Sequence, residues 1–240
     1  DGDWSSDVCS SDLKIWTKVH IERGYIMSVK KLFWENPYLT ELEAKVTSVN
    51  NNIITLDQTI AFAFSGGQQS DSGTIGGFQI IEAKKEEKEI FYTIKNNHNL
   101  IHNQDVMVII DWEKRYKLMK LHFMAEIILE LVYQNYNHPE KIGANITVDK
   151  ARIDFFWPEK ISEIFPDLIS KVNSIINSNL DIVSAFDDEE NERRYWCIEG
   201  FAKVSCGGTH LKKTGEIGLI SLKRHNLGSG KERIEIYLES

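Results

Sequence analysis

The hydrophobic period of this 240-residue chain changes near its middle, and that change constrains the fold more than any other feature. Upstream, short apolar runs are separated by turn residues, which is typical of β-strands. Downstream, apolar residues recur every three or four positions over residues 115–136, which indicates an α-helix with one buried face. The residues of that face are Leu118, His122, Ala125, Leu129, Val132 and Tyr136. Strands and helices in separate stretches predict an α+β protein.

The first half of the chain is expected to form strands that are spaced as in a small barrel or sandwich. The expected strands are residues 42–49, 53–56, 59–64, 78–81, 90–94 and 106–110. A Gly-rich loop at residues 65–77 interrupts them. We therefore expect a β domain over residues 27–112 that carries this loop.

The second half mixes helices and strands. A second helix is expected from Pro166 to about Asn177, because proline is favoured in the first turn of a helix. The strands expected around the helices are residues 144–148, 152–156, 182–186, 195–198, 218–223 and 233–237. The acidic run at residues 187–192 is interpreted as a solvated turn. Residues 113–240 are therefore expected to form an α+β domain.

The composition limits the class of protein. The chain has 28 basic and 36 acidic residues, a net charge of −8, so a nucleic-acid partner must be argued from a local basic patch. Three cysteines are too few for a framework of disulfides and indicate a reducing compartment. No apolar run approaches the roughly 18 residues of a membrane span. We expect a cytoplasmic protein with no membrane partner and no protein partner.

The N-terminal residues differ from the rest. Residues 1–13 are rich in Ser and Asp, lack any period, and resemble a translated sequencing-adapter peptide. We expect residues 1–26 to be a non-native or flexible tail, with Met27 as the natural start, and we exclude Cys9 from the functional analysis.

A first candidate site is the segment from Cys206 to His210, with two glycines between its ends. A thiolate and an imidazole are good zinc ligands, and Gly207 and Gly208 permit the tight turn that would fold both side chains onto one ion. The alternative is a Gly-rich turn that holds an unrelated Cys and His.

A second candidate site is His122 with Glu126, one turn apart on the expected helix. A lone His on an apolar face is more often a hydrogen-bonded core residue than a ligand. Together with Cys206 and His210, however, these residues supply N, O, S and N donors for a tetrahedral divalent ion. If Glu126 stays unbound, the other three still leave an open position for water or substrate.

The Gly-rich loop is the third candidate site. It includes Gly66, Gly67, Gln68 and Asp71, and it lacks the Lys of a P-loop and the glycine order of a dinucleotide fold. Its backbone N–H groups, with Gln68 and Asp71, are suited to a polar end of a substrate. The alternative is a long β-hairpin loop without a binding role.

Three segments together resemble a known family. They are AFSGGQQSDSG at residues 63–73, GANITVDKARIDF at residues 143–155 and SCGGTHLKKTGEIG at residues 205–218. Their order and wording resemble the free-standing alanyl-tRNA editing proteins, which are related to the editing domains of alanyl- and threonyl-tRNA synthetases. The resemblance covers about residues 42–238.

The resemblance implies a small N-terminal β-barrel followed by an α+β editing domain with helices packed on an antiparallel sheet. It implies Zn²⁺ held by a His-x3-His pair on a helix and by the pair that is Cys206 and His210 here. It also implies hydrolysis of the ester bond in mischarged tRNA for alanine, mainly seryl and sometimes glycyl.

One position departs from the family pattern. Where the family has its second helical His, this chain has Glu126. The carboxylate could bind zinc and make the ion a weaker Lewis acid, hold a water as general base, or mark the loss of metal and activity. We expect metal-assisted ester hydrolysis, with His122 and Glu126 as catalytic residues and Cys206 as a ligand.

The substrate is expected to contact two groups of residues. Gly66, Gly67, Gln68, Asp71 and Thr209 are expected to recognise the amino-acid end of the substrate. The basic residues expected to bind tRNA are Lys212, Lys213, Lys223 and Arg224, whose phosphate contacts would be sensitive to salt. A solvated strand face is the alternative for these basic residues.

Two other functional classes remain open on the sequence. One is a degenerate, non-catalytic tRNA-binding relative that has lost the full zinc site, as the substitution at Glu126 suggests. The other is a hydrolase that uses Cys206 as nucleophile with His210 or His122 as base.

Overall fold

The computed structural model describes residues 28–239. The expectations for residues 1–26, including Cys9, lie outside the described residues. Within them, the chain forms strands in both halves and two long helices, so the predicted α+β class is confirmed. No helix in the described range is long and apolar enough to cross a membrane.

The first half contains six antiparallel strands that close into a barrel in the order β2-β3-β7-β6-β5-β8. These strands are β2 (Glu41–Asn50), β3 (Ile53–Leu56), β5 (Gly73–Ile75), β6 (Phe78–Glu86), β7 (Glu89–Ile94) and β8 (Asp105–Ile110). A short parallel pair, β1 (Lys30–Lys31) with β4 (Gln58–Thr59), and the one-turn helix α1 (Leu32–Glu35) lie beside them. Alternate strand residues, such as Ile90, Tyr92 and Ile94, fill a core of their own.

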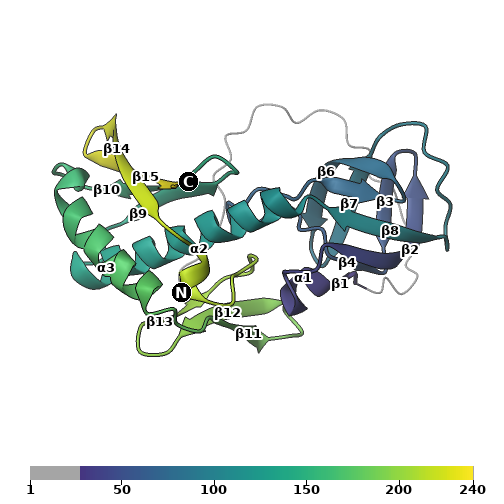
Figure 1. The fold of residues 1–240 in the computed structure, drawn as a ribbon. Helices are drawn as coiled ribbons and strands as arrows, with labels where there is room; N and C mark the ends of the chain where they lie inside the picture. The colour runs from purple at the N-terminus through teal and green to yellow at the C-terminus, as the bar shows by residue number, and fades with distance from the viewer. Residues whose placement is uncertain (1–27, 240) are drawn as a thin grey trace.

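The second half is arranged around the helix α2 (Trp112–Asn135), as Figure 1 shows. A four-stranded antiparallel sheet in the order β14-β15-β10-β9 lies on one side of α2, and a three-stranded sheet in the order β11-β12-β13 lies on the other. The strands of the first sheet are β9 (Lys141–Ile146), β10 (Ala151–Phe156), β14 (Ile220–Gly228) and β15 (Lys231–Leu238). Those of the second are β11 (Val183–Asp188), β12 (Arg193–Ile198) and β13 (Ala202–Ser205). The other helical segments are α3 (Phe165–Asn177) and the 3-10 turns Ile161–Ile164 and Thr214–Glu216.

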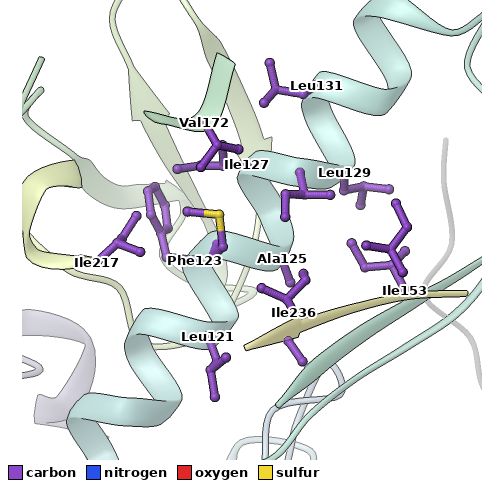
Figure 2. Packing of buried hydrophobic residues seen from close by; sticks show 14 of the residues in the cluster. Leu121, Phe123, Ala125, Ile127, Leu129, Leu131, Ile153, Val172, Ile217 and Ile236 are labelled. Atoms are coloured by element: carbon purple, nitrogen blue, oxygen red, sulfur yellow. The ribbon is translucent and has the colours of Figure 1, made fainter. Parts of the chain in front are cut away.

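Helix α2 is buried on nearly all sides over its central turns. Figure 2 shows its side chains directed both toward Ile153 and Ile236 of the four-stranded sheet and toward Val172 and Ile217 on the opposite side. The stripe of apolar residues predicted from the sequence is buried except for Tyr136, which is half-buried. The helix begins at its N-cap Asp111, whose side chain accepts a hydrogen bond of 3.1 Å from the Lys114 N–H.

Both predicted helices and most of the predicted strands are confirmed, but the strand at residues 59–64 is wrong in its main part. Only Gln58–Thr59 pairs as a strand, and residues 60–63 are buried without a ladder partner. Side chains satisfy this backbone instead: the Ala61 N–H donates to the Thr59 hydroxyl (3.0 Å) and the Phe62 N–H donates to the Asp71 carboxylate (2.7 Å). The short strands β5 and β13 were not predicted.

The interpretation of residues 187–192 as a solvated turn is also wrong at its end. The Glu192 carboxylate forms ion pairs with Lys31 and with Lys85, the latter at 2.8 Å, and its side chain is only 14% exposed. The neighbouring Glu190 carbonyl accepts a hydrogen bond from the Lys88 ammonium at 2.6 Å. Through these contacts, the turn between β11 and β12 connects the three-stranded sheet to the first half of the chain.

A buried ion pair joins the Gly-rich loop to α2. The Arg115 Nε donates to Asp71 Oδ1 at 2.9 Å, and Arg115 Nη2 pairs with Asp71 Oδ2; both side chains are almost fully buried. The remaining guanidinium donors reach the carbonyls of Pro37 (2.9 Å) and Ile60 (2.6 Å). Because each of the three guanidinium nitrogens has at least one partner, the charge is stabilised inside the protein.

We predict that Arg115→Ala lowers the free energy of unfolding by about 3–5 kcal/mol, because the mutation leaves the Asp71 carboxylate buried without its cation. Urea unfolding of the full chain measures the change. The matched control is Arg193→Ala, which removes an arginine from an exposed pair with Asp187 at 2.9 Å. A loss for Arg115→Ala no larger than that for the control would contradict the prediction.

Candidate metal centre

Four potential metal ligands from two distant parts of the chain meet between α2 and the loop that follows β13. His122 and Glu126 lie one turn apart on α2 and are buried. Cys206 and His210 lie on the loop, His210 buried and Cys206 half-buried. One ligand atom from each of the four residues lies within 4.8 Å of every other. The four side chains singled out from the sequence are therefore brought together.

The distances between neighbouring donor atoms are short and similar. His122 Nε2 lies 3.4 Å from Cys206 Sγ, and His210 Nε2 lies 3.2 Å from the same sulfur. The Glu126 carboxylate spans the two rings, with Oε1 3.4 Å from His122 Nε2 and Oε2 3.6 Å from His210 Nε2. Donors bound tetrahedrally to one zinc ion, at about 2.0–2.3 Å from it, would stand about 3.3–3.7 Å apart.

An incomplete set of hydrogen bonds also fits a cation. Glu126 Oε2 is buried and has no hydrogen-bond partner among the described residues. A buried carboxylate oxygen without a donor is costly, and a metal ion is one of the few partners that satisfies it. The donor set of one thiol, two imidazoles and one carboxylate suits zinc.

The electrostatics of the cluster point the same way. Burial alone would raise the pKa of Glu126, but neighbouring groups, the His122 imidazole first among them, outweigh burial and lower it. Burial lowers the pKa of His210 to about 3, so this ring is neutral and has the form that binds metals. Burial, followed by the charge of Glu126, raises the pKa of the Cys206 thiol well above its ordinary value. The thiolate therefore needs a cation beside it.

A glycine lies directly against one ligand. A Cβ atom on Gly208 would stand 1.9 Å from His122 Cε1 and 2.5 Å from its Nδ1. It would also stand 2.8 Å from Gln68 Oε1. Only a residue without a side chain fits between the imidazole and the Gly-rich loop.

Gln68 and Thr209 form a buried pair next to the cluster. Gln68 Nε2 donates to the Thr209 hydroxyl at 2.8 Å, and the Thr209 N–H donates to Gln68 Oε1 at 3.2 Å. The loop is held there by β9, because the Ile146 N–H donates to the Gly67 carbonyl at 2.8 Å. Gly66 and Gly67 have positive φ, and a Cβ on Gly67 would stand 3.1 Å from the Ala144 carbonyl oxygen.

Asp71 is not brought to the cluster with the other loop residues. Its two carboxylate oxygens accept hydrogen bonds from Arg115 and from the Phe62 N–H. Both oxygens therefore take part in hydrogen bonds that stabilise the fold. Of the two polar side chains of this loop that were expected to bind substrate, only Gln68 lies beside the metal ligands.

Two further residues support the cluster and were not found from the sequence. The Ser184 hydroxyl lies 3.0 Å from His210 Nδ1, which leaves Nε2 for the cluster. The Trp34 indole N–H donates to the Gly207 carbonyl at 2.7 Å and holds the loop. Neither residue lies in a recognisable motif, because each contact depends on the pairing of segments that are distant in sequence.

The four basic residues expected to bind tRNA are divided by the structure. Lys212 and Lys213 are exposed just after His210, and Lys213 forms an ion pair of 2.7 Å with Asp181. On β14, neighbouring Lys223 and Arg224 point to opposite faces of the sheet. Arg224 Nε donates at 2.6 Å to Glu232, which is buried. These basic side chains therefore do not form one patch.

Comparison with known proteins places the chain among tRNA-related proteins. A family model described as "Threonyl and Alanyl tRNA synthetase second additional domain" matches residues 197–235, which include Cys206 and His210. The alanyl-tRNA editing protein AlaX-M of Pyrococcus horikoshii is 35% identical over 219 residues, which cover 89% of this chain and 100% of that relative.

Alanine–tRNA ligases are also similar. The enzyme of Methanococcus maripaludis is 29% identical over an alignment of 240 positions, which covers 91% of this chain and 27% of the ligase. The enzyme of Ignicoccus hospitalis is 28% identical over 234 residues, which cover 86% of this chain and 25% of the ligase. The chain thus spans about a quarter of the length of these ligases.

We predict that Gly208→Ala weakens binding of Zn²⁺ by about 10–100-fold, because the new methyl group displaces the His122 ring. Titration of the full chain with Zn²⁺ against a competing chelator measures the affinity. The matched control is Gly207→Ala, whose Cβ meets no atom within 4 Å. Equal Zn²⁺ affinity in the two variants would show that the position of His122 does not determine metal binding.

Proposed function

The chain belongs to the family of alanyl-tRNA editing proteins, and on this premise we propose that it is a trans-editing hydrolase for mischarged tRNA for alanine. The substrates proposed are the seryl form first and the glycyl form second, in the cytoplasm. The observation that carries the proposal is the convergence of His122, Glu126, Cys206 and His210 at distances that suit one tetrahedral ion. The proposal assigns the chemistry to residues 113–240 and the Gly-rich loop to residues 27–112.

The four residues would hold a zinc ion, and each is positioned by a contact or an element of the fold. His122 and Glu126 are fixed by the buried helix, whereas Cys206 and His210 are fixed by the loop that Trp34 and Ser184 hold. When bound, the ion would supply a Lewis acid that polarises the ester and favours attack by water. The charges of a thiolate and a carboxylate would balance those of the ion, so the centre would be neutral inside the protein.

Cys206 acts in this proposal as a ligand and not as a nucleophile. Its pKa is raised by burial and by Glu126, so the free thiol is a weak nucleophile at neutral pH. The sulfur also lies between His122 and His210, in the middle of the donor set. A metal centre explains all four positions, whereas a thiol–imidazole couple uses only two of them.

Recognition of the amino acid is proposed for Gln68 and Thr209, beside the ligands. Within their pair, the Thr209 hydroxyl accepts from Gln68 and still has its own hydrogen to donate. A hydroxyl donor at this point suits the side-chain oxygen of serine. A site that hydrogen-bonds this oxygen discriminates strongly against alanine, which lacks it.

The main prediction is that the chain deacylates seryl-tRNA for alanine much faster than alanyl-tRNA for alanine, and that complete chelation slows this reaction by at least about 100-fold. Cys206→Ser should lower both zinc content and rate, because it removes a ligand. Cys197→Ser is the matched control, since Cys197 lies on β12 outside the cluster. Activity that survives metal removal would overturn the metal mechanism, and lack of both zinc and deacylation would favour a non-catalytic tRNA binder.

A further prediction concerns Glu126. We expect Glu126→His to keep zinc and to keep or raise the rate, because a neutral imidazole leaves the ion a stronger Lewis acid, whereas Glu126→Ala should lower zinc affinity. Zinc content and the rate of seryl-tRNA deacylation measure both effects. A Glu126→His protein that holds zinc but has lost hydrolysis would instead identify the carboxylate as the general base.

A further inference from the structure

The four-stranded sheet presents one face that is charged rather than apolar. Side chains alternate along a strand, and Ile153, Ile234 and Ile236 point to the α2 side, where they enter the core. The residues between them point to the other side, which we call the open sheet face. It comprises Lys150, Arg152, Asp154, Phe156, Ser221, Lys223, His225, Lys231, Arg233, Glu235 and Tyr237.

The register of the strands places these residues in adjoining rows. Lys223 on β14 lies opposite Glu235 on β15, which lies opposite Arg152 on β10. In the next row Arg233 lies between His225 and Asp154. Residues directly opposite each other on paired strands share a face, so the rows form one continuous surface.

The open sheet face carries five basic side chains and two acidic ones, in a chain whose net charge is −8. The acidic pair lies between basic neighbours: Arg233 Nε donates to Asp154 at 2.7 Å, and Lys150 pairs with Glu235. The Lys150 side chain is 37% and the Arg152 side chain 31% exposed, and Arg152 also pairs with Asp154. The surface is therefore locally positive on an acidic protein.

An aromatic ring lies within this positive surface. The Tyr237 ring has the Lys223 ammonium 4.7 Å and the Lys150 ammonium 5.9 Å from its centroid. Lys231 lies 5.3 Å from the centroid of the exposed Phe156 ring at the other end of the face. Lysines interleaved with accessible aromatic rings are typical of surfaces that bind nucleic acids, where the cations contact the backbone.

The metal centre lies on the α2 side of this sheet, and the sheet is connected to it through its edge strand rather than through the open sheet face. The edge strand β9 pairs with the Gly-rich loop, where the Gln69 N–H donates to the Ile146 carbonyl at 3.0 Å. The preceding residue, Gln68, reaches Thr209 beside His210. An extended polyanion bound to the open sheet face would therefore have to pass the β9 edge and the Gly-rich loop to reach the ligands.

We propose that the open sheet face binds the phosphate backbone of the RNA, with Lys223 and Lys231 as its principal cations. This inference rests on the proposed function, because it names the surface that holds the tRNA during editing. It assigns RNA binding to Lys223 rather than to Arg224, since Arg224 lies on the opposite face and is bonded to Glu232.

The test uses the double variant Lys223→Gln/Lys231→Gln of the full chain and unacylated tRNA for alanine as the probe. We expect the Kd to rise about tenfold near 0.1 M salt, and the slope of log K against log salt to fall by about two, since two phosphate contacts are lost. Zinc content and thermal unfolding should remain unchanged.

The matched control is Lys95→Gln/Lys117→Gln, which removes two exposed lysines elsewhere and changes the net charge equally. A Kd and salt slope equal to those of the control would overturn the inference. Loss of binding in Lys212→Gln/Lys213→Gln alone would place the RNA on the other side of the cluster and would also overturn it. If the parent chain binds tRNA but hydrolyses no ester, the proposed function fails while the binding surface stands.

Discussion

The burial of α2 between two sheets is the constraint on which the rest of the structure depends. The helix has the four-stranded sheet on one side and the three-stranded sheet with α3 on the other, so its central turns contact protein in all directions. A helix in this position cannot rotate or slide without opening both interfaces. Its two polar residues near the middle, His122 and Glu126, therefore have fixed positions before any ligand arrives.

Placing such polar groups inside an apolar core is costly, and the arrangement of the loop after β13 is best understood as the compensation for that cost. Cys206 and His210 face the helix residues at hydrogen-bond-like distances, yet one oxygen of the Glu126 carboxylate still lacks a hydrogen-bond partner among the described residues. A cluster that is almost satisfied, and that would be completed by one cation, is the arrangement of a metal site rather than of an ordinary buried network.

The sequence predicts those features whose pattern lies within one short segment of the chain. The period over residues 115–136 predicted α2, Pro166 marked the start of α3, and the spacing of Cys206 and His210 identified half of the candidate cluster. Residues 60–63 were misjudged because apolar runs look alike whether their N–H groups meet a strand or a side chain such as Asp71. The contacts of Ser184 and Glu192 depend on partners far along the chain, so no local pattern indicates them.

Two side chains of the Gly-rich loop attach it to the second half of the molecule, Asp71 through Arg115 and Gln68 through Thr209, in addition to the backbone hydrogen bonds of the loop with β9. Arg115 and His122 are seven residues apart on one helix, so about 10.5 Å of rigid rod separates the first of these contacts from the metal ligand. A hinge motion between the barrel and the rest of the molecule must therefore either break one of these two side-chain contacts or move the loop together with the barrel. The loop therefore links the two halves mechanically, and a movement of the barrel would displace Gln68 relative to His122.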